Sequence, residues 1–193
     1  MEIIAIDKPE AKERLFAVLK AGGVAVVPTD TVYGLACDAF NADAVEKLFL
    51  IKERDREKAI PVFVTDRGML EQIARIDEPL ATVLFNFWPG ALTAVLAAQH
   101  VFPEALLAGT STVGVRIPNY SFILDLMREY GKPLAVTSAN KSGEGSFTRI
   151  ARVEHDLKEG IAPDLLIDAG DLPESVPSTV IDCTKTPPVI LRE

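Results

Sequence analysis

A short apolar run that opens into a hydroxyl-rich turn constrains this chain more than any other feature of its sequence. Residues 24–27 read Val-Ala-Val-Val and are followed at once by Pro-Thr-Asp-Thr-Val-Tyr-Gly-Leu at residues 28–35. Four apolar residues bounded by turn-forming ones predict a buried strand. The turn offers hydroxyls that donate and accept hydrogen bonds, and Gly34 permits close approach of the backbone. We therefore expect a small-molecule site at the end of this strand; the alternative is a turn whose hydroxyls bond their own backbone.

The rest of the chain alternates between short apolar runs and helical patterns. Further strands are expected near residues 60–64, 92–97, 113–117, 134–137, 165–167, 179–181 and 189–191. Helices are expected at 11–19, after Asn41, after Asp66, after Glu78, at 122–130 and at 153–159. Asp7 and Glu10 predict a capping box for the first helix, and Asn41 predicts a cap for the second. Strands separated by helices favour an α/β (α+β) fold, and the closely spaced strands after residue 165 favour a mixed sheet.

Composition and charge narrow the class of protein. At 193 residues, with 48% hydrophobic and 25% charged residues, the chain suits one well-buried domain over residues 1–193. No apolar run approaches the ~18 residues of a membrane span, and the N-terminus lacks a secretory pattern, so we expect a cytoplasmic protein without membrane contact. Two cysteines and two histidines show no zinc-site spacing, so no metal ligands are predicted. A net charge of −8 opposes a nonspecific nucleic-acid coat.

Cationic residues stand out in two places although the net charge of the chain is negative. Residues 47–58 contain five lysines and arginines interleaved with carboxylates, which indicates either an anion site or a solvated, ion-paired helix end. Arg116 lies among apolar neighbours, so it needs an anionic partner, either a ligand or a protein carboxylate. Residues 109–114 lack the Gly-Lys-Ser/Thr ending of a phosphate-binding loop, and no Gly-x-Ser-x-Gly sequence is present. The residues alone therefore predict an anion- or nucleotide-handling α/β protein.

Six segments in order resemble the YrdC-like family, the threonylcarbamoyl-AMP synthases. The resemblance covers about residues 8–192. Its segments are Pro-Thr-Asp-Thr-Val-Tyr-Gly-Leu at 28–35, Lys-x-Arg-x-x-x-Lys at 52–58, Trp-Pro-Gly-Ala-Leu-Thr at 88–93, Val-Gly-Val-Arg-Ile-Pro at 113–118, Ser-Ala-Asn-x-Ser-Gly at 138–143, and Ser-Thr-Val-Ile-Asp at 178–182 with Leu-Arg at 191–192. The fold that this resemblance implies is a twisted mixed β-sheet with helices on both faces, YrdC/RibB-like, around a concave basic cavity.

The resemblance also implies a reaction and a set of site residues. L-Threonine, bicarbonate or CO2, and ATP would give L-threonylcarbamoyladenylate and pyrophosphate, with Mg²⁺ and without a covalent enzyme intermediate. Lys52 and Arg54 would act as electrostatic stabilisers. The residues implied for threonine are Thr31, Arg116, Ser138 and Ser178. Those implied for ATP are Arg54, Lys58, Thr112, Asn140, Thr148 and Arg192.

The implied product serves the N6-threonylcarbamoyladenosine modification of tRNA, so the expected partners include downstream tRNA threonylcarbamoyl-transferase proteins. An alternative function is an RNA-binding translation or ribosome-maturation factor that binds tRNA or double-stranded RNA in the same basic cavity. A low aromatic content of 7% argues against it. Two departures from the family pattern stand out: the register of Lys58 is ambiguous by one residue, and Phe63 stands where some members carry a polar substrate contact.

Overall fold

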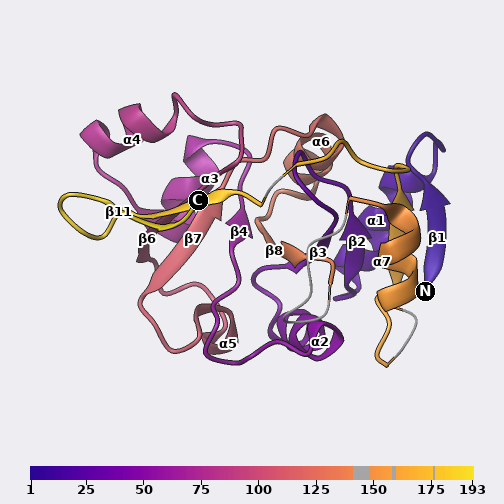
Figure 1. The fold of residues 1–193 in the computed structure, drawn as a ribbon. Helices are drawn as coiled ribbons and strands as arrows, with labels where there is room; N and C mark the ends of the chain where they lie inside the picture. Colours follow the sequence, from indigo (N-terminus) through magenta and orange to yellow (C-terminus); the bar gives the residue numbers. More distant parts are fainter. Residues whose placement is uncertain (141–147, 158–159, 176) are drawn as a thin grey trace.

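The computed structural model describes residues 1–140, 148–157, 160–175 and 177–193. Its described strands form a single mixed sheet in the order β1-β9-β2-β3-β8-β4-β7-β6-β10-β11, with β5 paired to β6 (Figure 1). Their bounds are β1 Glu2–Ala5, β2 Ala25–Val27, β3 Gly34–Asp38, β4 Val62–Phe63, β5 Ala74–Arg75, β6 Leu92–Ala98, β7 Thr112–Arg116, β8 Leu134–Ser138, β9 Leu165–Asp168, β10 Thr179–Asp182 and β11 Val189–Arg192. The predicted mixed sheet is confirmed.

Seven helices pack on this sheet in the described residues. Their bounds are α1 Ala11–Lys20, α2 Ala42–Lys52, α3 Arg67–Ile73, α4 Glu78–Leu84, α5 Glu104–Leu107, α6 Ser121–Tyr130 and α7 Ile150–Asp156. None of these helices has the length and the apolar composition that a membrane crossing requires. Strands β1, β3 and β5 and helix α5 were not predicted from the sequence, and the end of the helix expected at 153–159 lies outside the described residues.

Side-chain alternation along the central strands divides the apolar core in two. In β2, Val26 belongs to one buried cluster, whereas Ala25 and Val27 belong to the other. The first cluster takes Leu48 of α2, and the second takes Leu15 of α1. Because successive side chains of a strand point to opposite faces, the two clusters lie on opposite sides of the sheet. The predicted arrangement of helices on both faces is confirmed.

The hydroxyl-rich turn is shorter than expected because Gly34 is already a strand residue. β3 begins at Gly34 and pairs antiparallel with β2 and with β8, so that Gly34 lies opposite Ser138. A β-carbon on Gly34 would come within 2.8 Å of Val136 Cγ1. The neighbouring strand β8 therefore requires a small residue at this position, in addition to any approach of a ligand to the backbone.

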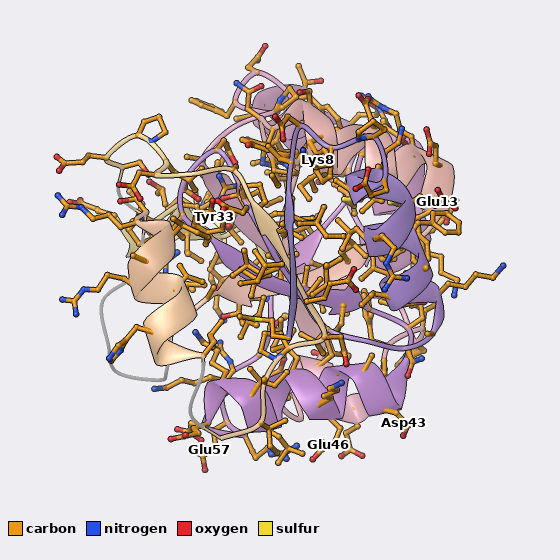
Figure 2. The ribbon with its side chains drawn as sticks, turned by 90° about the vertical axis from the view of Figure 1, so that its right-hand side faces the viewer. Lys8, Glu13, Tyr33, Asp43, Glu46 and Glu57 are labelled. Carbon is orange, nitrogen blue, oxygen red and sulfur yellow. The ribbon has the colours of Figure 1, made fainter. Side chains whose placement is uncertain are left out.

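Side-chain caps fix where several of the helices begin. The Asn41 side chain accepts a hydrogen bond from the Ala44 amide, as predicted, and Asp66 and Asp77 cap α3 and α4 in the same way. The capping box predicted for the first helix is wrong, because Glu10 at its cap makes no side-chain bond. At the other end of α2, Glu53 has a φ of 51°, a left-handed conformation that ends the helix at Lys52. Figure 2 shows Glu46 on the outer side of α2.

Replacing Asn41 by alanine should lower the free energy of unfolding by about 1 kcal/mol, because the first turn of α2 loses its side-chain acceptor. Denaturant unfolding followed by circular dichroism measures the change. Asn41→Asp is the matched control, since a carboxylate accepts the same bond. Equal stability of the alanine and aspartate variants would contradict the capping role.

Candidate functional site

A cavity of about 170 Å³ opens where the turn after β2 meets the middle of the sheet. Strands that are far apart in sequence supply its walls. Its lining residues are Thr29, Thr31, Val32, Gly34, Arg54, Pro61, Phe63, Thr93, Arg116, Val136, Thr137, Ser138, Pro177, Ser178 and Arg192. All the charged side chains in this lining are arginines. The expected positive potential of the cavity stays a prediction, which these three arginines support.

Arg116 is the most buried of the three arginines, with 5% of its side chain exposed. Its Nη2 donates to Asp30 Oδ1 at 2.7 Å, its Nη1 to Thr31 Oγ1 at 3.2 Å, and its Nε to the Gly90 carbonyl at 3.0 Å. Phe63 lies with its ring centroid 5.6 Å from the guanidinium carbon. Burial lowers the pKa of Arg116, while the charge of Asp30 opposes that shift. Of the two partners that the sequence left open, the structure shows the protein carboxylate, and Arg116 also lines the cavity, where a ligand could reach it.

Arg54 and Arg192 line the same cavity and are held mainly by backbone oxygens. Arg54 donates to the carbonyls of Lys58 at 2.9 Å and Ala59 at 2.7 Å. Arg192 donates from Nη2 to the Ser178 carbonyl at 2.7 Å and to Ser178 Oγ at 3.3 Å. The charge of Arg192 contributes to lowering the pKa of Arg116, so the two cations influence one another. The solvated ion pair considered for Arg54 is not what the structure has, because its partners are carbonyls at the cavity wall.

Lys52 is buried behind the cavity, outside the residues that line it. Its Nζ lies 2.6 Å from the Ser138 carbonyl, 3.2 Å from Ser138 Oγ, and 3.0 Å from both the carbonyl and Oδ1 of Asn140. Burial, and to a lesser degree the charge of Arg54, lowers the pKa of Lys52 to about 7. The surrounding oxygens favour the ammonium form, which has three protons to donate. Lys52 therefore ties the end of α2 to the residues that follow β8.

Hydroxyl groups line the cavity in hydrogen-bonded pairs. Thr29 Oγ1 lies 3.1 Å from Thr31 Oγ1, and Thr93 Oγ1 lies 2.8 Å from Ser178 Oγ. Thr29 Oγ1 also bonds backbone groups of its own turn, accepting from the amides of Thr31 and Val32. The two interpretations of the turn are therefore both represented: its hydroxyls bond the local backbone, and the turn lines a cavity.

The structure brings together six of the residues expected at the site and places five others outside the cavity lining. Those in the lining are Thr31, Arg54, Arg116, Ser138, Ser178 and Arg192; those outside it are Lys52, Lys58, Thr112, Asn140 and Thr148. Lys58 is exposed, Asn140 is buried beside Lys52, and the Thr148 carbonyl accepts from the Leu172 amide. Residues 142 and 143 of the Ser-Ala-Asn-x-Ser-Gly segment lie outside the described residues.

Thr29, Thr93 and Thr137 line the cavity but were not predicted as site residues. Thr29 and Thr93 stand in the segments at 28–35 and 88–93, and Thr137 directly precedes the segment at 138–143. Their hydroxyl groups near the ends of predicted strands were the sequence signal that could have identified them as site residues. Within the part of the chain that the structure describes, no group of three or more His, Cys, Asp or Glu side chains could hold a metal ion.

Comparison with known proteins identifies the family. The Sua5/YciO/YrdC family model, described as "Telomere recombination", matches residues 17–193. The chain belongs to this family. Its relatives include a threonylcarbamoyl-AMP synthase of Bacillus subtilis, 40% identical over 91% of this chain and 51% of the relative, and one of Pyrococcus abyssi, 37% identical over 90% of this chain and 51% of the relative. The chain thus spans about half the length of these two relatives.

Solved structures of family members share the fold. A crystal structure of P. abyssi Sua5 complexed with L-threonine matches 100% of this chain and 57% of its own, with a TM-score of 0.92 and 34% identity. The crystal structure of E. coli YciO matches 100% of this chain and 94% of its own, with a TM-score of 0.87 and 26% identity. The resemblance to this family and the expected mixed α/β fold are both confirmed.

Replacing Lys52 by methionine should lower the free energy of unfolding by about 2–4 kcal/mol, because buried oxygens of Ser138 and Asn140 would lose their donor. The loss should also depend on pH. The pKa of Lys52 is lower in the folded protein, about 7, than its ordinary value of 10.5, so between these values the unfolded chain binds more protons and the wild type gains stability as pH rises. The variant lacks this gain. Denaturant unfolding of both proteins at pH 7 and pH 9 should show a larger difference at pH 9, and a smaller one there would contradict the lowered pKa.

Proposed function

We propose that this chain is a threonylcarbamoyl-AMP synthase, a nucleotidyltransferase. The threonine amine takes up CO2, directly or from bicarbonate, to form a carbamate. A carbamate oxygen then attacks the α-phosphorus of ATP, and the bond to the pyrophosphate leaving group breaks. No covalent bond to the protein is needed. The observation that carries the proposal is a cavity lined by three arginines and six Ser and Thr side chains. The chain also shares its fold with a Sua5 whose structure is complexed with L-threonine.

The threonine side of the proposed site is the turn after β2 and its neighbours. Arg116 suits a carboxylate, because a guanidinium forms charge-assisted hydrogen bonds through paired N–H groups. The hydroxyls of Thr31, Ser138 and Ser178 suit the hydroxyl and amine of threonine, since each can donate or accept. Phe63 would close this side with an apolar wall.

The ATP side of the proposed site lies toward α2 and β11. Arg54 and Arg192 would face the phosphates, where charge builds on the α-phosphoryl oxygens and the departing pyrophosphate. Lys52 would contribute its charge from behind the wall, while it holds Ser138 and Asn140 in place. Lys58, Thr112, Asn140 and Thr148, which lie outside the cavity lining, would complete the proposed contacts. ATP would enter as its magnesium complex.

The wider role is also a proposal. The adenylate would pass to tRNA threonylcarbamoyl-transferase proteins for the N6-threonylcarbamoyladenosine modification of tRNA, in the cytoplasm, with residues 1–193 acting as one domain. The names of the curated relatives support this role. The second candidate function is an RNA-binding factor that uses the same cavity. Its binding should depend strongly on salt concentration, because phosphate contacts to RNA weaken steeply with ionic strength.

Pyrophosphate release from ATP should require L-threonine and bicarbonate together, because the attacking carbamate exists only when both are present. A coupled pyrophosphate assay measures the rate, and mass spectrometry identifies the adenylate. Serine should be a poorer substrate, since its missing methyl group forgoes about 1 kcal/mol of burial. Equal turnover without an added amino acid would exclude the proposed activity. Undiminished turnover in excess chelator would exclude the magnesium requirement.

Arg116→Lys and Arg192→Lys should each impair the use of a different substrate. The first should chiefly raise the threonine concentration for half-maximal rate, and the second the ATP concentration, each by about tenfold or more. Lysine keeps the charge but loses the planar donors, so the comparison isolates hydrogen-bond geometry. Steady-state kinetics with one substrate varied at a time measures both values. A rise for the same substrate in both variants would contradict the division of the site.

The alanine variants should differ in stability. Arg116 has three hydrogen-bonded protein partners and a ring beside it. Arg116→Ala would leave the partly buried Asp30 carboxylate unpaired, which costs about 3–5 kcal/mol. Arg192→Ala, at an exposed position, should cost much less. Thermal unfolding of the two variants checks this order.

A further inference from the structure

We propose that Asp30 is a positioning residue that fixes the orientation of Arg116 in the cavity. The predicted effect on threonine use rests on the proposed function, whereas the predicted effect on the orientation of Arg116 does not. Asp30 stands in the turn after β2 but is absent from the cavity lining. Its side chain is 13% exposed, and that of Arg116 is 5% exposed. Every other ion pair between described residues has a partner that is 38% exposed or more. This pair is therefore the one that solvent screens least.

The contacts of Arg116 divide its five N–H donors into two groups. Within the described residues, one donor on each of the three nitrogens is used, by Gly90, Thr31 and Asp30. One donor on each terminal nitrogen then remains for a ligand. Since the guanidinium is rigid and planar, three anchors on three nitrogens determine where the remaining two N–H groups point. Of the three anchors, the carboxylate is the one that carries charge, so it forms the strongest bond.

The electrostatic surroundings explain why the carboxylate is needed. Burial disfavours the charged guanidinium, and the positive charge of Arg192 acts in the same direction. Asp30 is the opposing charge. Without it, Arg116 would keep only two neutral acceptors, Thr31 Oγ1 and the Gly90 carbonyl, beside a second cation, and the side chain would gain by turning toward solvent. An asparagine keeps the shape and one acceptor but removes the charge. A glutamate keeps the charge but moves it outward by one methylene group.

Asp38 provides a matched control. Its carboxylate is buried, and its Oδ2 accepts from Lys132 Nζ at 2.7 Å and from Tyr130 Oη at 2.8 Å. It lies at the far end of β3 from the turn and lines no part of the cavity. Asp38→Asn therefore removes the charge of another ion-paired carboxylate without touching Arg116, although its partner Lys132 is half exposed. An effect that both variants share reflects a general loss of protein stability. An effect confined to Asp30→Asn reflects a change in the orientation of Arg116.

The first test needs no substrate. The Nε–H resonance of Arg116, assigned by its loss in Arg116→Lys, is followed by nitrogen–proton correlation spectroscopy in wild type, Asp30→Asn and Asp38→Asn. We expect the signal to shift and exchange with water at least tenfold faster in Asp30→Asn alone. An unchanged signal in Asp30→Asn would overturn the positioning role, whatever the protein catalyses.

The second test uses the reaction. Asp30→Asn should raise the threonine concentration for half-maximal pyrophosphate release by at least tenfold and the corresponding ATP concentration by less than twofold. Asp30→Glu should recover part of the loss, and Asp38→Asn should leave both values unchanged. A threonine effect equal in Asp30→Asn and Asp38→Asn, or an equal rise for ATP, would overturn the proposal. If the wild type makes no adenylate, the proposed function fails, and the resonance test still decides the role of Asp30.

Discussion

The antiparallel pairing of β3 with β8 is the constraint on which the site depends. It runs from Gly34 opposite Ser138 to Asp38 opposite Leu134, and it places the turn after β2 beside the residues that leave β8. A side chain at Gly34 would collide with Val136, so this register needs glycine at that position. A slip of one residue would turn every side chain of β3 to the opposite face and separate the turn from the cavity. The site is therefore a product of strand register.

Oxygen atoms from several turns and strand ends allow cationic side chains to gather at the site. Arg54, Arg116 and Lys52 would repel one another, yet each is held by oxygens that belong to a different strand end or turn. Backbone carbonyls and one carboxylate replace water around these side chains without neutralising them all. Such fixed donors cost no reorganisation when an anion arrives, which is the property that phosphoryl-transfer sites share. The fold holds the cationic side chains in fixed positions, and their charges supply a positive electrostatic potential.

Sequence patterns predicted most strands and helices because apolar alternation and cap residues are local signals. β3 was missed because its Gly-Leu-Ala-Cys-Asp sequence lacks β-branched residues, and its strand conformation comes from two neighbours across the sheet. The family motifs picked out Arg54, Arg116, Ser138 and Arg192, which the fold does bring to one cavity. The position of Lys52 behind the wall and the bond between Asp30 and Arg116 were beyond such patterns, because both depend on contacts between residues more than 80 positions apart.

Strand β9 has a consequence for the order in which the chain can fold during synthesis. It lies between β1 and β2 and runs parallel to both, so β1 has its sheet partner only once residues 165–168 exist. Strand β1 must therefore remain without its sheet partner β9 while the residues between them are synthesised. A segment made early is here among the last to be incorporated into the sheet.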